Sequence, residues 1–110
     1  MRLVTRADLD GLTCAVLLTR CERIETIELV HPQDVADRRL PIGPDDILTN
    51  VPYHPACGIW FDNHLLTDPK SMPPTGFRGR YAQAASAARV VYEHYLPAHP
   101  ELAQYERLLA

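Results

Sequence analysis

Two aspartates, Asp8 and Asp10, lie two positions apart in the motif DLDG, directly after a short apolar segment at residues 2–5. Hard cations such as Mg²⁺ and Mn²⁺ prefer carboxylate oxygens, and two neighbouring carboxylates repel unless a cation or a proton intervenes. Two such ions about 3.5–4 Å apart can hold a phosphate and generate an attacking hydroxide. Asp8 and Asp10 are therefore candidate metal ligands. The alternative is that they only cap the helix that follows.

Polar side chains also follow two later apolar segments. Asn50 comes after residues 46–49, and Asp62, Asn63 and His64 come after residues 58–61. An Asp beside a His can orient the imidazole, coordinate a metal, or belong to an ordinary loop. His31 and His54 each precede a proline, and we interpret them as loop residues.

The hydrophobic pattern predicts strands at residues 2–5, 26–30, 46–49 and 58–61. It predicts helices at 12–20, 34–39, 81–96 and 100–109, with Asp10 as the N-cap of the first and residues 65–80 as a loop. Strands alternating with helices indicate an α/β domain with a mostly parallel sheet. Since ligands bind beyond the carboxyl ends of such strands, we expect the polar residues described above to meet at one edge.

The length, composition and charge of the chain limit the classes of protein to which it can belong. A chain of 110 residues with 46% hydrophobic residues forms one domain with a real core. The formal net charge of -3 argues against binding to large nucleic acids. No apolar run reaches the length of a membrane span and no signal peptide is evident, so we expect a cytoplasmic protein that does not bind membranes. The spacing of Cys14, Cys21 and Cys57 is not typical of zinc, which favours reduced thiols.

Four segments taken together resemble the DHH phosphoesterase superfamily, specifically its exopolyphosphatase-related branch. In chain order they are VTRADLDGLTCAVLL (4–18), ELVHPQD (28–34), ILTNVPYHPACGIWFDNH (47–64) and SAARVVYEHY (86–95). The resemblance implies a Rossmann-like domain of three layers, followed by a smaller substrate domain. It implies hydrolysis of phosphoric esters or anhydrides with two Mn²⁺ or Mg²⁺ ions. Residues 1–110 would then be part of a DHH domain with motifs one to three, without the fourth acidic motif and the substrate domain.

The resemblance also implies roles for single residues. Asp8 and Asp10 match the first-motif carboxylates that bind metal, and Asn50 stands where active members place a metal-bridging Asp. Asp62 matches the Asp of the DHH triplet, and His64 matches its last His, which faces the substrate phosphate. We therefore expect metal ligands at Asp8, Asp10, Asn50 and Asp62, and catalytic roles for Asp62 and His64.

Three departures from the family pattern predict a weakened site. Asn63 stands where the family has its middle, metal-binding His, Asn50 is neutral, and Arg6 and Val4 leave no histidine upstream of Asp8. An amide is a poorer ligand for Mn²⁺ than an imidazole or a carboxylate. Metal binding is accordingly predicted to be weak or absent in this chain, and its turnover to be impaired.

Two hypotheses of different classes follow. The chain is the N-terminal domain of a metal-dependent phosphohydrolase acting on polyphosphate, pyrophosphate, or short or cyclic nucleotides. Alternatively it is a non-catalytic phosphate- or nucleotide-binding or assembly module on a degenerate DHH fold. Either way the expected partner is a phosphate-containing small molecule or a short nucleotide. Self-association is also expected, because a missing second domain would leave apolar surface exposed.

Overall fold

Five short parallel strands form one sheet in the computed structural model, which describes residues 1–109. The order across the sheet is β2-β1-β3-β4-β5. The strands are β1 (Arg2–Thr5), β2 (Thr26–Leu29), β3 (Asp46–Thr49), β4 (Ile59–Asp62) and β5 (Gly79–Tyr81). The predicted Rossmann-like α/β fold with a parallel sheet is confirmed, and β1 to β4 lie within one residue of their predicted positions.

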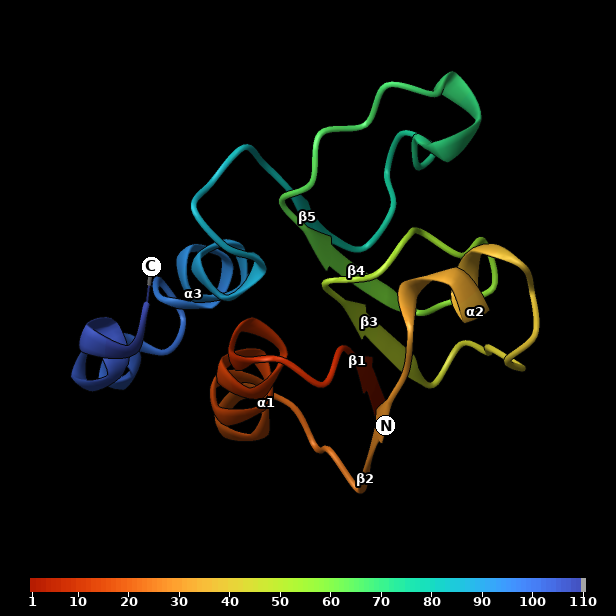
Figure 1. Ribbon diagram of the computed structural model, residues 1–110. Helices are drawn as coiled ribbons and strands as arrows, with labels where there is room; N and C mark the ends of the chain where they lie inside the picture. The colour runs from red at the N-terminus through yellow and green to blue at the C-terminus, as the bar shows by residue number, and fades with distance from the viewer. Residues whose placement is uncertain (110) are drawn as a thin grey trace.

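Helices cover both faces of this sheet and complete three layers (Figure 1). On one face lie α1 (Leu9–Cys21) and α3 (Ala87–Tyr95), over a core that includes Leu3, Ile47 and Phe61. On the other face lies the short α2 (Pro32–Ala36), over a second core built around Val4, Leu48 and Trp60. Two short 3₁₀ helices, η1 (Pro69–Ser71) and η2 (Pro100–Leu108), follow later in the chain. Consecutive strand residues thus fill opposite cores, as the alternation of a strand requires.

The structure corrects several predicted elements. The helix expected at residues 34–39 is α2, which begins at Pro32 and ends at Ala36. Residues 79–81 form β5 where a loop was expected, α3 begins at Ala87 and not at residue 81, and the last helix is of the 3₁₀ type. Strand β5 depends on Gly79, whose φ is +120°, because a Cβ there would lie 1.9 Å from the carbonyl oxygen of Trp60. A strand of three residues that contains glycine and arginine carries no apolar alternation, so sequence pattern could not reveal it.

An ion pair joins the beginnings of β1 and β3. The Arg2 guanidinium donates to both carboxylate oxygens of Asp46, at 2.8 and 2.9 Å, and the N–H of Gly43 donates to Asp46 Oδ2 at 2.8 Å. Burial alone would raise the pKa of Asp46, but the bonds from Arg2 and Gly43 outweigh it and hold that pKa below its usual value. The pair therefore stabilises the end of the sheet opposite to the candidate site.

We expect Asp46→Asn to lower the free energy of unfolding by about 1.5–3 kcal/mol at pH 7, since a charge-assisted pair is lost. Because folding lowers the pKa of Asp46, this stabilisation is complete above the unfolded pKa of about 3.9 and is lost as pH falls through the folded pKa. Urea unfolding of both proteins between pH 7 and about pH 2.5 measures the difference. Glu25→Gln removes an exposed pair with the N-terminus and is the matched control. A difference in unfolding free energy between wild type and Asp46→Asn that is as large at about pH 2.5 as at pH 7 would contradict the lowered pKa of Asp46.

Apolar side chains lie exposed along α1 and the edge strand β2. Leu9 is 77% exposed, Leu12 63%, Ile27 47% and Leu29 60%. No helix within residues 1–109 is long and apolar enough to cross a membrane. Such neighbouring apolar side chains on a helix and an unpaired strand edge favour protein contacts.

Self-association through this surface stays a prediction. We expect Leu12→Lys combined with Leu29→Lys to shift the protein toward a monomer in light scattering at high concentration. Leu65→Lys alters an equally exposed leucine, 71% accessible, in the loop after β4, and should leave the mass unchanged. A monomeric wild type would show that the prediction is wrong.

Candidate functional site

Polar residues from three strand ends meet at the carboxyl edge of the sheet, as the sequence predicted. The Asn50 amide, after β3, donates to both oxygens of Asp8, after β1, at 3.1 and 3.3 Å. Asn50 also lines a cavity of about 410 Å³ together with Asp62 and His64 of the β4 end and with Arg6. Asn50, Asp62 and His64 thus line one cavity rim although they come from the ends of different strands, and Asp8 is joined to this rim through its bonds with Asn50.

Asp8 begins α1, which corrects the prediction that Asp10 would do so. Its Oδ1 accepts the N–H of Gly11 at 2.8 Å, and its own backbone is extended. That is the geometry of an N-cap, in which an acidic side chain satisfies a free N–H of the first turn. Asp8 therefore caps α1. Arg6 lies beside it, with Nε 3.5 Å from Asp8 Oδ2.

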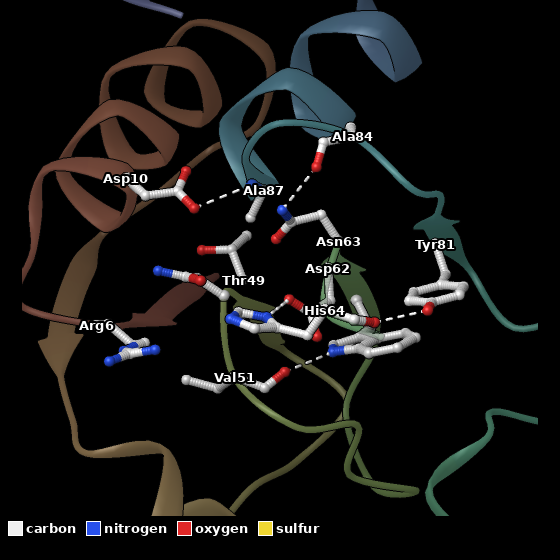
Figure 2. Close-up of polar contacts among 12 residues, drawn as sticks. Arg6, Asp10, Thr49, Val51, Asp62, Asn63, His64, Tyr81, Ala84 and Ala87 are labelled. Carbon is white, nitrogen blue, oxygen red and sulfur yellow. Dashed lines mark hydrogen bonds and ion pairs between the residues drawn. The ribbon is translucent and has the colours of Figure 1, made fainter. Parts of the chain in front are cut away.

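Asp10 caps a different helix. One of its oxygens accepts the N–H of Ala87 at 3.0 Å, at the start of α3 (Figure 2). The other accepts the N–H of Ala88 at 2.8 Å. Ser86 accepts the N–H of Arg89 in the same turn, at 3.0 Å. The positive end of the α3 dipole stabilises the Asp10 carboxylate. The carboxylate therefore fixes α3 against α1 across 77 positions of the sequence.

Gly11 permits the close approach of α1 to β1. A Cβ at this position would lie 2.0 Å from the carbonyl oxygen of Arg6 and 2.9 Å from Thr5 Oγ1. Beneath it, the Thr49 hydroxyl donates to that of Thr5 at 2.9 Å, which joins the buried ends of β1 and β3. The glycine of DLDG is thus a steric requirement of the site.

The backbone of Asn50 has a φ of +61°, in the left-handed region that asparagine tolerates better than most residues. Its side chain is buried, its N–H donates to the carbonyl of Phe61 at 3.2 Å, and the Trp60 indole donates to the carbonyl of Val51 at 2.9 Å. These bonds hold the amide against Asp8. A second carboxylate in this place would repel Asp8 unless a cation lay between them.

Asp62 and His64 form a hydrogen-bonded pair at the end of β4. His64 Nδ1 lies 2.5 Å from Asp62 Oδ1. Asp62 is buried and His64 is about half exposed. Burial raises the pKa of Asp62 although its bonds to His64 and to nearby N–H groups act in the opposite direction. With Nδ1 held by Asp62, Nε2 is the nitrogen that is left for a ligand in the cavity.

Sequence reasoning missed Tyr81, which lies in β5. Its hydroxyl donates to the carbonyl oxygen of His64 at 2.6 Å, and its ring stacks on that of Trp60 with centroids 5.7 Å apart (Figure 2). This stacked pair fixes the backbone of the residue expected to face the phosphate. The sequence pattern did not predict β5, so it gave no reason to place Tyr81 beside His64.

Asn63 turns away from the cavity rim toward the segment before α3. Its Nδ2 donates to the carbonyl of Ala84 at 2.9 Å, while its Oδ1 is buried without a hydrogen-bond partner among the residues described.

The thiol of Cys14 lies behind this rim. Burial raises its pKa, and the charges of Asp10, Asp8 and Asp62 raise it further. The Cys14 thiol therefore lies close enough to all three carboxylates for their charges to affect its ionisation.

The residue types suit Mg²⁺ or Mn²⁺ in chemistry, since Asp8, Asp10 and Asp62 carry carboxylates, the ligands that these ions prefer. Each carboxylate is already bound to hydrogens of the protein, and a carboxylate oxygen with a second lone pair can still accept a cation. No three acidic, His or Cys side chains within residues 1–109 are grouped to hold one ion. The metal-ligand roles of Asp8, Asp10, Asn50 and Asp62 stay predictions.

Comparison with known proteins supports the fold class. No family model and no curated protein matches the chain. The chain is similar to a solved structure of a DHH-type fold. That protein is the pGpG-specific phosphodiesterase PggH from Vibrio cholerae, at 43% sequence identity and a TM-score of 0.73. The match covers 94% of this chain and 33% of PggH, so the chain spans about a third of that protein's length. The exopolyphosphatase-related branch is not specifically supported.

Gly11→Ala tests the steric requirement. Helix propensity alone predicts that alanine would stabilise a helix by about 1 kcal/mol. The overlap with the Arg6 carbonyl is larger, and we expect a net loss of at least about 2 kcal/mol in the free energy of unfolding, measured with urea. Gly43→Ala is the control, since a Cβ there meets nothing within 4 Å. Equal stability of the two variants would refute the packing argument.

Proposed function

We propose that this chain is the metal-binding N-terminal part of a phosphodiesterase that cleaves short nucleotides, with a linear dinucleotide as substrate. The observation that carries this proposal is the meeting of Asn50, Asp62 and His64 around one cavity, with Asp8 hydrogen-bonded to Asn50. The chain is 43% identical to PggH over 94% of its length. Placement of a site at the carboxyl edge of a parallel sheet agrees with the general behaviour of such folds.

The side chains of this edge suit a phosphate. Asp62 holds Nδ1 of His64, so that a protonated imidazole donates from Nε2 to a phosphate oxygen. Arg6, beside Asp8, adds positive charge to the same cavity. Asp8, Asp10, Asn50 and Asp62 would hold Mn²⁺ or Mg²⁺, which would neutralise phosphate charge. The Asn50 amide would present its oxygen to the ion in place of its nitrogen.

The substrate class follows from the comparison and not from the fold. PggH is described as specific for pGpG, which is a linear dinucleotide with a terminal phosphate. A nucleotide is accordingly favoured over polyphosphate or pyrophosphate, which the exopolyphosphatase-related branch would suggest. A cytoplasmic location is proposed with it.

A non-catalytic nucleotide-binding module is the second candidate, and the hydrogen bonds of the carboxylates favour it. Asp8 is satisfied by Asn50 and Gly11, and Asp10 by two N–H groups of α3. The edge is thus stable without an ion, as expected where Asn63 replaces a metal-binding His. Weakened metal binding and impaired turnover are also what the sequence predicts for a phosphohydrolase with these substitutions.

The activity of the full-length protein on pGpG separates the two candidates. We expect hydrolysis that requires Mn²⁺ or Mg²⁺ and stops with EDTA. Removal of a group that donates a proton to phosphate typically lowers kcat about 10²–10⁴-fold, so we expect that loss for His64→Asn. The melting temperature should stay close to that of the wild type because His64 is about half exposed.

His99→Asn changes a histidine at the start of η2 and serves as the matched control for turnover. Binding of pGpG without product, in the presence of Mn²⁺, would reject the phosphodiesterase and support the binding module. Full activity of His64→Asn would reject the assigned role of this residue.

A further inference from the structure

The cavity beside His64 is larger than one phosphate requires. Its volume of about 410 Å³ lies in the range of about 300–1,000 Å³ that is typical of small-molecule sites. Besides Asn50, Asp62 and His64, its walls include apolar groups of Pro52, Tyr53 and Leu66. The ring of Tyr53 is held edge-on by Trp60 and Phe77, with centroids 5.4 and 6.3 Å apart. A rigid aromatic wall of this kind suits a nucleobase.

Positive charge gathers in the same cavity. Its lining includes Arg6, Arg38 and Lys70, whereas the chain as a whole has a net charge of -3. Within residues 1–109 no carboxylate lies at ion-pair distance from Arg38 or Lys70, while the adjacent Arg39 contacts both Asp34 and Asp37, at 3.6 and 3.5 Å. Arg38 and Lys70 are therefore cations without an acidic partner in a cavity that suits a ligand.

The backbone of Arg38 supports a role for its side chain. Arg38 has a φ of +58° and directly follows the C-cap of α2, Asp37. The N–H of Arg38 donates to the carbonyl of Val35 at 3.2 Å, and that of Arg39 to Asp34 at 3.0 Å. Glycine is preferred at this helix end, since a left-handed backbone is unfavourable for residues with a Cβ. Arginine at this position is therefore less favourable for folding than glycine would be. Residues with such an unfavourable backbone conformation are concentrated at functional sites.

We propose that Arg38, assisted by Lys70, binds the terminal phosphate of a linear dinucleotide, with a base against Tyr53 and the internal phosphodiester at His64. This inference rests on the proposed function and adds the part of the substrate that is recognised. A terminal phosphate carries almost two charges and offers oxygens that a guanidinium binds in a bidentate manner. A dinucleotide without that phosphate, or a cyclic one, offers no such group.

The test compares pGpG with GpG, which lacks the terminal phosphate, on the full-length protein. Binding is measured by calorimetry with EDTA present, and cleavage is measured separately with Mn²⁺. We expect the wild type to bind pGpG about 10–100-fold more tightly than GpG, the range for one or two charge-assisted bonds. Arg38→Gly should abolish this preference and leave GpG affinity unchanged, while its melting temperature is equal to or higher than that of the wild type.

Arg39→Gly is the matched control, because it removes the same charge one residue away from the cavity lining. It should keep the preference for pGpG. Cleavage of both nucleotides without any binding preference would overturn the terminal-phosphate site and leave the proposed function standing. Preferential binding of pGpG that depends on Arg38, without cleavage, would support the site and reject the catalytic proposal. Binding of neither nucleotide would overturn the site as well.

Discussion

The structure of the candidate site depends on two carboxylates that point to different partners. Asp8 starts α1 and accepts the amide of Asn50 from the end of β3, while Asp10 accepts two N–H groups at the start of α3. Together they join these three elements at the carboxyl edge of the sheet. Neither bond pattern forms unless α1 begins close to β1, and this in turn requires Gly11. The motif DLDG is therefore a packing motif in addition to a candidate metal motif.

The burial of Asp62 at this edge of the sheet affects the stability of the fold. Burial raises its pKa, which means that the folded protein favours its protonated form more than the unfolded chain does. As pH rises through the window between the usual pKa of Asp62 and the raised one, this residue lowers the stability of the fold. A protonated His64 or a cation would offset that loss by stabilising the charged form. The destabilised carboxylate thus favours the binding of positive charge, as expected of a functional site.

Sequence alone predicted the sheet edge and the residues on it, because strand periodicity and strand direction depend on local pattern. It placed the helix cap at Asp10 because Asp8 and Asp10 are equally good caps by residue type, and only the position of the Gly11 N–H decides between them. Strand β5, and with it Tyr81, depends on a glycine approaching the Trp60 carbonyl, which is a long-range contact. Arg38 gave no signal either, since its left-handed backbone and its lack of an acidic partner are visible only in three dimensions.

The bonds of Asp10 also determine what metal binding would involve. An ion at Asp10 would share the carboxylate with Ala87 and Ala88, so its affinity would depend on how well those N–H groups remain bound. The segment before α3 also provides the Ala84 carbonyl that holds Asn63. Because one carboxylate would then serve both the helix and the proposed ion, metal affinity and the position of α3 would be coupled. A change at the ion would accordingly reach the α1–α3 contact, which lies over the larger of the two cores.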